Sequence, residues 1–210
     1  MYFIFDCDGV LLNSNKIKNK CFYHITKKYF GKKAALEILN LNKKQGGISR
    51  QEKFQFIIDK YGEKKEKNLL CKIFSKISMK LIKNCESINL NYLYENKLPD
   101  EKWGIISGAN HNDLEILVST HFNKINFDLG VWGSPQKKSD IFFQYFQKLD
   151  RSQKIYYFGD SFNDFIFSKE VNVDFVFIRE WSQELPNIIG KINSLSFDNV
   201  IQALLYLRSK

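Results

Sequence analysis

Two aspartates, Asp6 and Asp8, directly follow the apolar run "MYFIF" at the start of the chain. Residues two positions apart in an extended segment lie on the same side of it, so both carboxylates are expected to face one space. Clustered carboxylates are costly unless a cation neutralises them. An isolated Asp-x-Asp is more common at turns and helix caps than at metal sites, so its meaning depends on the residues that lie near it.

Three further polar segments follow short apolar runs. They are Ser107-Gly108 after "WGII", "GSPQKKSD" with Lys137 and Lys138, and "GDSFND" with Asp160 and Asp164. Ligands of open parallel sheets bind at the carboxyl ends of the strands, so these segments are expected to meet Asp6 and Asp8 in one crevice. Hard oxygen ligands favour Mg²⁺. The joint pattern therefore predicts a magnesium site beside a lysine and a hydroxyl group.

The strands and helices that would position these residues alternate from about residue 86. Apolar segments predict strands at 103–107, 129–133, 154–160 and 174–178, and helical patterns lie near 111–120, 138–149, 162–169 and 197–208. This alternation predicts an α/β fold with a Rossmann-like parallel sheet and helices on both faces. The strand at 2–6 has no neighbouring strand in the sequence, so it must join this later sheet.

Residues 15–85 predict a helical bundle inserted after the first strand. Helices are expected at 15–30, ending near Gly31, at 32–42, from Ser49 onward and at 66–84. Ser49 followed by Glu52 is a capping-box pattern. The last helix is expected to bury one apolar face formed by Leu70, Ile73, Phe74, Ile77 and Leu81. We therefore predict two domains, a core of 1–14 and 86–210 and a helical cap of 15–85.

Positive charge is concentrated in this insertion. The chain has a formal net charge of +9, and residues 15–85 hold 19 Lys and Arg against 5 Asp and Glu. A basic lobe attracts anions, either small phosphorylated substrates or nucleic acid. The sequence contains no DNA-binding or RNA-binding motif, so specific nucleic-acid binding is not expected. A basic nucleic-acid-binding module stays the alternative from a different functional class.

The sequence also bears on location. It has no apolar run near the roughly 20 residues that a membrane helix needs. Its first residues lack the basic start of a signal peptide. The four cysteines form no Cys-x-x-Cys pair, which favours free thiols in a reducing compartment. We therefore expect a cytoplasmic protein without a membrane partner.

Taken in order, the motifs resemble those of the haloacid dehalogenase-like phosphatases, in the subgroup of phosphoglycolate phosphatase and β-phosphoglucomutase. The matching segments are "FDCDGVLLNS", "IISGAN", "SPQKKSD" and "FGDSFND". The insertion between the first two motifs corresponds to the family's first type of cap domain. The resemblance implies a Mg²⁺-dependent phosphatase that acts on a small phosphorylated metabolite.

The resemblance also implies a role for each carboxylate. Asp6 would be the nucleophile that forms an aspartyl-phosphate, and Asp8 would be the general acid and base. Mg²⁺ would bind the Asp6 carboxylate, the Asp8 main-chain carbonyl and Asp160, with Asp164 acting through a water. A dehalogenase needs the nucleophile but not Asp8 or the metal cluster, so the set favours phosphoryl transfer.

Backbone and side-chain donors would hold the transferred phosphoryl group. The expected donors are the backbone N–H groups of Cys7, Asp8 and Gly9, together with Ser107, Gly108 and the side chain of Lys138. Lys138 is preferred to Lys137 because the family's lysine lies three residues after the proline, which is Pro135 here.

Two cap positions bear on the substrate. Arg50 is the single arginine of residues 15–85, and "GGISR" resembles the Gly-x-Ser-Arg segment that faces the active site in cap-bearing sugar-phosphate enzymes. A guanidinium group suits a phosphate or carboxylate. The β-phosphoglucomutase type carries a histidine four residues after the position of Ser14, where this chain has Lys18. The resemblance thus implies a phosphomonoesterase for a sugar, polyol or related phosphate, with a phosphomutase as the alternative.

Overall fold

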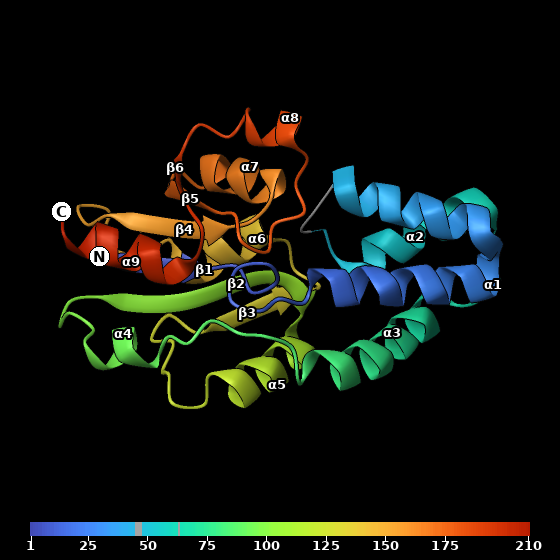
Figure 1. Cartoon of the computed structure of the whole chain (residues 1–210), viewed down its shortest axis with the longest axis horizontal. Helices are drawn as coiled ribbons and strands as arrows, with labels where there is room; N and C mark the ends of the chain where they lie inside the picture. Colours follow the sequence, from blue (N-terminus) through green and yellow to red (C-terminus); the bar gives the residue numbers. More distant parts are fainter. Residues whose placement is uncertain (45–47, 63) are drawn as a thin grey trace.

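The computed structural model describes residues 1–44, 48–62 and 64–210, so Gly46 and Gly47 of the "GGISR" segment lie outside the described residues. The chain forms a parallel sheet covered by helices, and a lobe of three helices projects from one end of it (Figure 1). Both chain termini lie at the end of the molecule opposite this lobe.

The sheet has six strands in the described part of the chain, all parallel, in the order β3-β2-β1-β4-β5-β6. Their bounds are β1 Tyr2–Phe5, β2 Lys102–Asn110, β3 Val131–Ser134, β4 Ile155–Gly159, β5 Asp174–Ile178 and β6 Leu195–Phe197. In the centre, Phe5 of β1 lies opposite Ile105 of β2 and Phe158 of β4. All residues of β1 are buried because helices cover both faces. The predicted α/β fold and the place of its first strand are confirmed.

Side chains of β1 alternate between the two faces and so belong to two hydrophobic cores. Phe3 and Phe5 belong to a core with α4, α5 and α9, whereas Tyr2 and Ile4 belong to a core with α6 and α7. The covering helices are α4 Asn91–Glu95, α5 His111–His121, α6 Lys138–Ile141 with a π-helical continuation Phe142–Phe146, α7 Phe162–Glu170, α8 Pro186–Ile189 and α9 Val200–Arg208. Sequence patterns did not predict α4, α8 or β6, because each has only 5, 4 or 3 residues.

The helical lobe consists of α1 Asn15–Lys44, α2 Arg50–Tyr61 and α3 Lys67–Ile82. α1 is interrupted at Gly31, where φ is 87° and ψ is 173°, a conformation outside the helical region that glycine adopts readily. The predicted stop near Gly31 is therefore confirmed. Ser49 caps α2 through the predicted capping box with Glu52.

The core of this lobe contains three phenylalanine rings, one from each helix. Phe22 packs against Phe54 and Phe74, with ring centroids 5.4 and 4.2 Å away. The buried residues of α3 follow an i, i+4 spacing and are Leu70, Phe74, Ser78 and Ile82. The predicted apolar face was wrong at Ile77 and Leu81, which are 42% and 50% exposed. In this small lobe, α1 and α2 cover only a narrow stripe of α3, and these two residues lie beside it.

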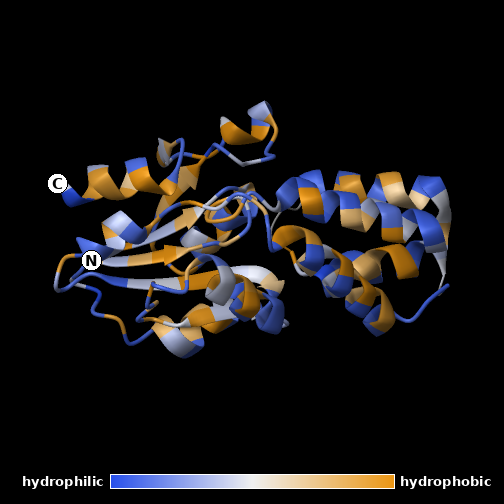
Figure 2. Ribbon diagram, turned by 60° about the horizontal axis from the view of Figure 1, so that its bottom comes forward, coloured by the Kyte–Doolittle hydropathy of each residue, from blue (hydrophilic) through white to orange (hydrophobic). Residues whose placement is uncertain are grey.

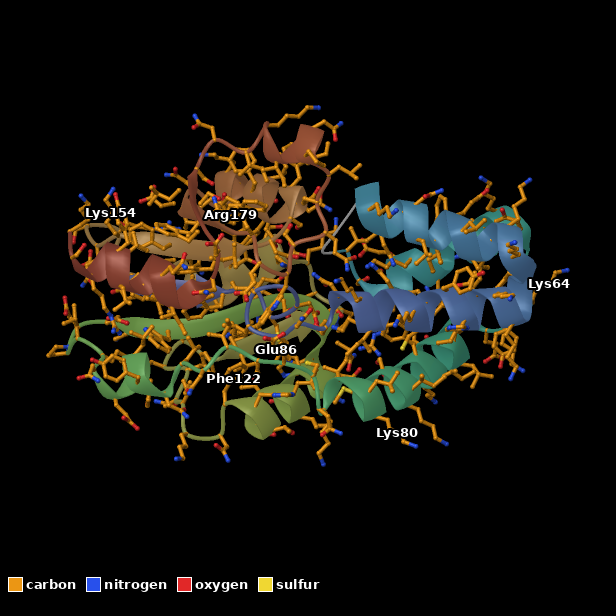
Figure 3. All side chains as sticks on the ribbon, in the orientation of Figure 1. Lys64, Lys80, Glu86, Phe122, Lys154 and Arg179 are labelled. Atoms are coloured by element: carbon orange, nitrogen blue, oxygen red, sulfur yellow. The ribbon has the colours of Figure 1, made fainter. Side chains whose placement is uncertain are left out.

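Hydropathy separates the inside from the outside in both parts of the molecule (Figure 2). Apolar residues fill the interior of the lobe, and hydrophilic residues predominate on its outer surface, where Ile77 and Leu81 are among the exceptions. Figure 3 shows Lys64 and Lys80 on that outer surface. Among the helices of the described residues, none has both the length and the hydropathy that crossing a membrane requires.

Two chain segments connect the sheet to the lobe, and they lie side by side. The outgoing segment follows β1, and the returning segment follows α3. Leu12 of the outgoing segment forms backbone bridges to both Asp8 and Ser87. The N–H of Asn13 also donates a hydrogen bond to the carbonyl of Glu86, at 2.9 Å. The lobe is therefore joined to the sheet directly beside Asp8.

Candidate active site

The carboxyl ends of three neighbouring strands place polar side chains in one cleft. Asp6 follows β1, Ser107 lies in β2 and Asp160 follows β4, and all three are buried. The other side of the cleft is formed by α1 and α2, whose residues line the same cavity as Asp6 and Asp8. Sheet and helical lobe thus build the cavity together.

Gly9 allows the chain after β1 to approach Asp160. Its φ of 79° favours glycine, and a Cβ atom there would lie 2.1 Å from the Asp160 Oδ2. Its N–H, an expected phosphate donor, instead donates to the carbonyl of Leu12 at 2.8 Å. In this structure, Gly9 therefore shapes the loop and its N–H group is already occupied.

Three carboxylates form a cluster that fits a hard cation. Oxygens of Asp6, Asp160 and Asp164 lie within 4.8 Å of one another. Burial raises the pKa of Asp160 well above its usual value, and the negative charges of Asp164 and Asp6 raise it further. Burial also raises the pKa of Asp6, to about 6, although Lys138 opposes the shift. The Asp6 Oδ1 is buried and accepts no hydrogen bond from the described residues. A buried set of mutually repulsive carboxylates suits Mg²⁺.

Lys138 lies within this acidic cluster. Its Nζ atom is 2.6 Å from Asp164 Oδ1, 3.3 Å from Asp6 Oδ1 and 2.8 Å from the Tyr157 hydroxyl. Burial opposes the charge of this lysine, but Asp164 and Asp6 outweigh it and raise its pKa above the usual value. Lys138 is therefore cationic here. Lys137, the other candidate, is exposed and immediately precedes α6.

The Asp164 carboxylate is already well supplied with protein donors. Its Oδ2 accepts from the Ser161 hydroxyl at 2.5 Å and from the Ser161 N–H at 3.2 Å. Its Oδ1 accepts from Lys138 and from the Tyr157 hydroxyl, the latter at 3.1 Å. Each oxygen of Asp164 thus has two protein donors. The expected contact of Asp164 with a metal through a water stays a prediction.

Asp8 is held by side chains from two different segments. The Ser14 hydroxyl and the Lys18 ammonium both donate hydrogen bonds to its carboxylate. Burial alone would raise the pKa of Asp8, but the charge of Lys18 and these hydrogen bonds lower it overall. Lys18 belongs to α1, so the helical lobe supplies a direct partner of Asp8.

The remaining expected phosphate donors lie around the same cavity. Ser107 and Gly108 line it. The Ser107 hydroxyl also accepts a hydrogen bond from the N–H of Ala109 at 3.2 Å. The Cys7 side chain is fully buried in the hydrophobic core, so only its backbone is left for a role at the site.

Arg50 lines the cavity but is engaged by protein groups. Its guanidinium forms an ion pair with Asp113 of α5 and donates to the Ser75 hydroxyl of α3. It also lies over the Phe74 ring, 5.2 Å from its centroid. Arg50 is expected to bind the substrate, but in this conformation Asp113 already neutralises its charge.

Sequence reasoning missed several residues of the site. Tyr157 links Lys138 to Asp164, and Asn15 donates to Asp160 Oδ2 at 2.8 Å. Lys53 lines the cavity from α2. No sequence motif marks these residues, since a tyrosine in an apolar strand and a lysine among many lysines carry no spacing signal.

The comparisons with known proteins agree with this architecture. A family model described as haloacid dehalogenase-like hydrolase matches residues 3–178. Comparison with curated protein sequences gives no match.

Solved structures share the fold over nearly the whole chain. A putative phosphoglycolate phosphatase from Lactobacillus plantarum has 17% identity and a TM-score of 0.69, with 97% of each chain covered. A β-phosphoglucomutase from Clostridium difficile has 18% identity and a TM-score of 0.73, covering 99% of this chain and 95% of that one. A hydrolase from Pseudomonas syringae has 15% identity and a TM-score of 0.76, covering 100% and 98%.

Proposed function

The chain belongs to the haloacid dehalogenase-like hydrolase family, and from this membership we propose that it hydrolyses phosphate monoesters of small organic molecules. One observation carries the proposal. The Asp6 Oδ1 is buried beneath the cavity, accepts no hydrogen bond from the described residues and lies 3.3 Å from the ammonium of Lys138. A carboxylate oxygen with a free lone pair beside a cation is suited to attack phosphorus.

In the first step, an oxygen of Asp6 attacks phosphorus and the ester P–O bond breaks. For this step Asp8 must be protonated. Its carboxylic acid gives the proton to the leaving oxygen and becomes a carboxylate, and the phosphoryl group stays on Asp6 as an aspartyl-phosphate. In the second step, Asp8 takes a proton from water, and the resulting hydroxide attacks phosphorus. The bond to Asp6 breaks and inorganic phosphate leaves. Asp6 is then a free carboxylate again, and Asp8 is again protonated.

The residues around Asp6 supply the charge and the donors for this reaction. Asp6, Asp160 and the backbone carbonyl of Asp8 would hold Mg²⁺, with Asp164 as an outer partner. The bound ion supplies positive charge against the phosphoryl oxygens. Lys138 adds a second positive charge, and the Ser107 hydroxyl is a further donor at the cavity wall.

We further propose that the helical lobe, residues 15–85, acts as a cap on a core formed by 1–14 and 86–210. α1 and α2 line the same cavity as Asp6, which supports this division. A closed cap excludes bulk water from the aspartyl-phosphate step. We also infer a cytoplasmic location, which the four free cysteines of the structure support.

A phosphomutase is the second candidate because a β-phosphoglucomutase shares the fold. In that reaction, the phosphoryl group would pass from Asp6 to a second oxygen of a sugar and not to water. Lys18 bears on this alternative, since it occupies the place where the mutase type carries its histidine and it pairs with Asp8. We favour hydrolysis, and release of inorganic phosphate without an isomerised sugar phosphate would distinguish the two reactions.

The replacement Asp6→Asn tests the proposal. We expect phosphate release from para-nitrophenyl phosphate and from a panel of phosphometabolites to fall by about a thousand-fold or more, because the amide removes the attacking carboxylate. Thermal unfolding should show an intact fold. The matched control is Asp140→Asn, which changes an exposed aspartate of α6. Near-normal turnover by the Asp6→Asn protein would refute the assignment.

A further inference from the structure

Cationic side chains from the helical lobe line the cavity opposite Asp6. Among the described residues, these are Lys18, Lys43, Arg50 and Lys53. Lys18 is paired with Asp8, and Arg50 is paired with Asp113. Lys43 is exposed, so water can hydrate its charge. Lys53 is different because it is partly buried and its side chain has no hydrogen bond or ion pair to any residue that the structure describes.

The surroundings of Lys53 disfavour an unpaired charge. It lies in the first turns of α2, with its Nζ atom 5.0 Å from the centroid of the Phe22 ring. Burial and then the positive charge of Lys18 lower its pKa more than Asp8 and Glu52 raise it, and the resulting pKa is about 8. Interaction with an aromatic face offsets only part of the cost of such a charge. The carboxylates of Asp8 and Glu52 favour its charge but form no ion pair with it, so this partly buried ammonium would be stabilised by an anion that lies closer.

The cavity has a catalytic side and a cap side. Asp6, Ser107 and Gly108 line it from the sheet, whereas Lys53 lines it from α2. A phosphoryl group lying against Asp6 therefore leaves Lys53 facing another part of the same substrate. Side chains of Ile48, Phe22 and Phe74 line the cavity as well and provide apolar wall for a short carbon skeleton.

We propose that Lys53 binds a second anionic group of the substrate, a carboxylate or a second phosphate, while the phosphoryl group to be removed lies against Asp6. The inference rests on the proposed phosphatase function and deepens it, because it names the substrate class as organic phosphates with a second negative group. It assigns this recognition to Lys53 and not to Arg50, whose guanidinium is held by Asp113 and Ser75.

The test compares substrates that differ in the second anion. The pairs are 3-phosphoglycerate against glycerol 3-phosphate, for a carboxylate, and fructose 1,6-bisphosphate against fructose 6-phosphate, for a second phosphate. The wild-type protein should have a kcat/KM at least about tenfold higher for the doubly anionic member of one pair, which corresponds to about 1.4 kcal/mol. The pair that shows the preference identifies the anion.

The variants are Lys53→Met, Lys53→Arg and a control, Lys72→Met, at an exposed lysine of α3. Lys53→Met should remove most of this preference, Lys53→Arg should restore it, and Lys72→Met should keep the wild-type ratio. Equal losses on both members of a pair, or a wild-type enzyme without a preference in either pair, would overturn the inference.

Binding separates this inference from the proposed function. In the Asp6→Asn background, calorimetry measures the affinity for 3-phosphoglycerate and fructose 1,6-bisphosphate without turnover. The additional change Lys53→Met should weaken binding of the preferred ligand about tenfold or more. Unchanged affinity would refute the role of Lys53 even if hydrolysis is established. Conversely, absence of phosphate release by the wild-type protein from every substrate, including para-nitrophenyl phosphate, would refute the function itself.

Discussion

The Asp8 carboxylate accepts hydrogen bonds from two side chains that belong to different segments of the chain. Ser14 holds it from the loop after β1, and Lys18 holds it from α1. Both hydrogen bonds keep the carboxylate directed toward the cavity that it lines. At the residue scale, the proposed acid and base is therefore positioned by the helical lobe as well as by the sheet.

The change Asp8→Asn should separate the two proposed proton transfers. Hydrolysis of an alkyl phosphate should fall by about 10²- to 10⁴-fold, because its leaving oxygen needs a proton. The first turnover of para-nitrophenyl phosphate should fall much less, since para-nitrophenolate leaves without one. Stopped-flow measurement should then show a burst of para-nitrophenol followed by slow turnover. Equal first-turnover losses on both substrates would contradict the role as general acid.

The charge of Lys53 should also affect the thermal stability of the protein. Its pKa is lowered from 10.5 to about 8, mainly by burial and then by Lys18, so the folded state disfavours its charged form. A lowered lysine pKa destabilises the fold below about pH 8, and this penalty fades as the pH rises toward the unfolded value. Lys53→Met should therefore raise the thermal midpoint by several degrees near neutral pH and by less near pH ~10.

Differential scanning fluorimetry at both pH values gives the measurement, with Lys72→Met as the control. That lysine is exposed, so its replacement should leave the midpoint nearly unchanged. A lower midpoint for Lys53→Met at neutral pH would mean that the lysine has a stabilising partner.

At the scale of elements, α2, α3 and α5 meet at one ion pair. Arg50 of α2 pairs with Asp113 of α5, and Ser75 of α3 hydrogen bonds to the same carboxylate at 2.9 Å. Asp113 lies in the first turn of α5, where a negative charge is favoured by the helix dipole. The three helices belong to both parts of the molecule, so this cluster fastens the helical lobe to the core.

A double-mutant cycle of Arg50→Met and Asp113→Asn should show this link. We expect a coupling of about 1–3 kcal/mol in the free energy of unfolding, because the two side chains are only 8% and 15% exposed. The control pair is Lys60 and Glu37, whose side chains are 52% and 23% exposed, so it should couple much more weakly. Denaturation by urea measures both cycles, and equal couplings would argue against a fastening role.

The sequence predicted helix boundaries correctly where a few neighbouring residues determine them. The capping box at Ser49 and Glu52 and the break at Gly31 both depend on neighbouring residues alone. The exposed face of α3 at Ile77 and Leu81 was predicted wrongly, because the buried stripe depends on where α1 and α2 lie. Apolar periodicity limits which faces can be buried, but the neighbours choose among them.

At the scale of the whole molecule, the cavity lies where two parts of opposite charge character meet. The sheet contributes Asp6, Asp8 and Asp160, and the helical lobe contributes Lys18 and Lys53. Lysines such as Lys64 and Lys80 lie on the outer surface of the lobe instead (Figure 3). A basic nucleic-acid-binding module stays the alternative prediction for that surface, and weak, salt-sensitive binding would mark its charge as non-specific.

Mg²⁺ should stabilise the whole fold if the acidic cluster binds it. An ion present at about 100 times its dissociation constant adds about 2.7 kcal/mol, which raises the thermal midpoint by about 5–10 °C in a chain of this size. Asp160→Asn should abolish this response and, without the ion, should stabilise the protein by removing mutual repulsion among Asp6, Asp160 and Asp164. The control Asp140→Asn should respond as the wild type does. An unchanged wild-type midpoint at millimolar MgCl₂ would contradict a magnesium site.

The sequence by itself determined the parallel α/β fold, the inserted helices and the segments that meet at the strand ends. These features follow from apolar periodicity and from short motifs, because both depend only on residues that lie close together in the chain. The pairing of Lys18 with Asp8 and of Arg50 with Asp113 became known only from the folded chain. The Lys53 side chain lies over the Phe22 ring and forms no ion pair with a described residue. Which charges pair depends on distances between elements far apart in the chain, and no local pattern contains those distances.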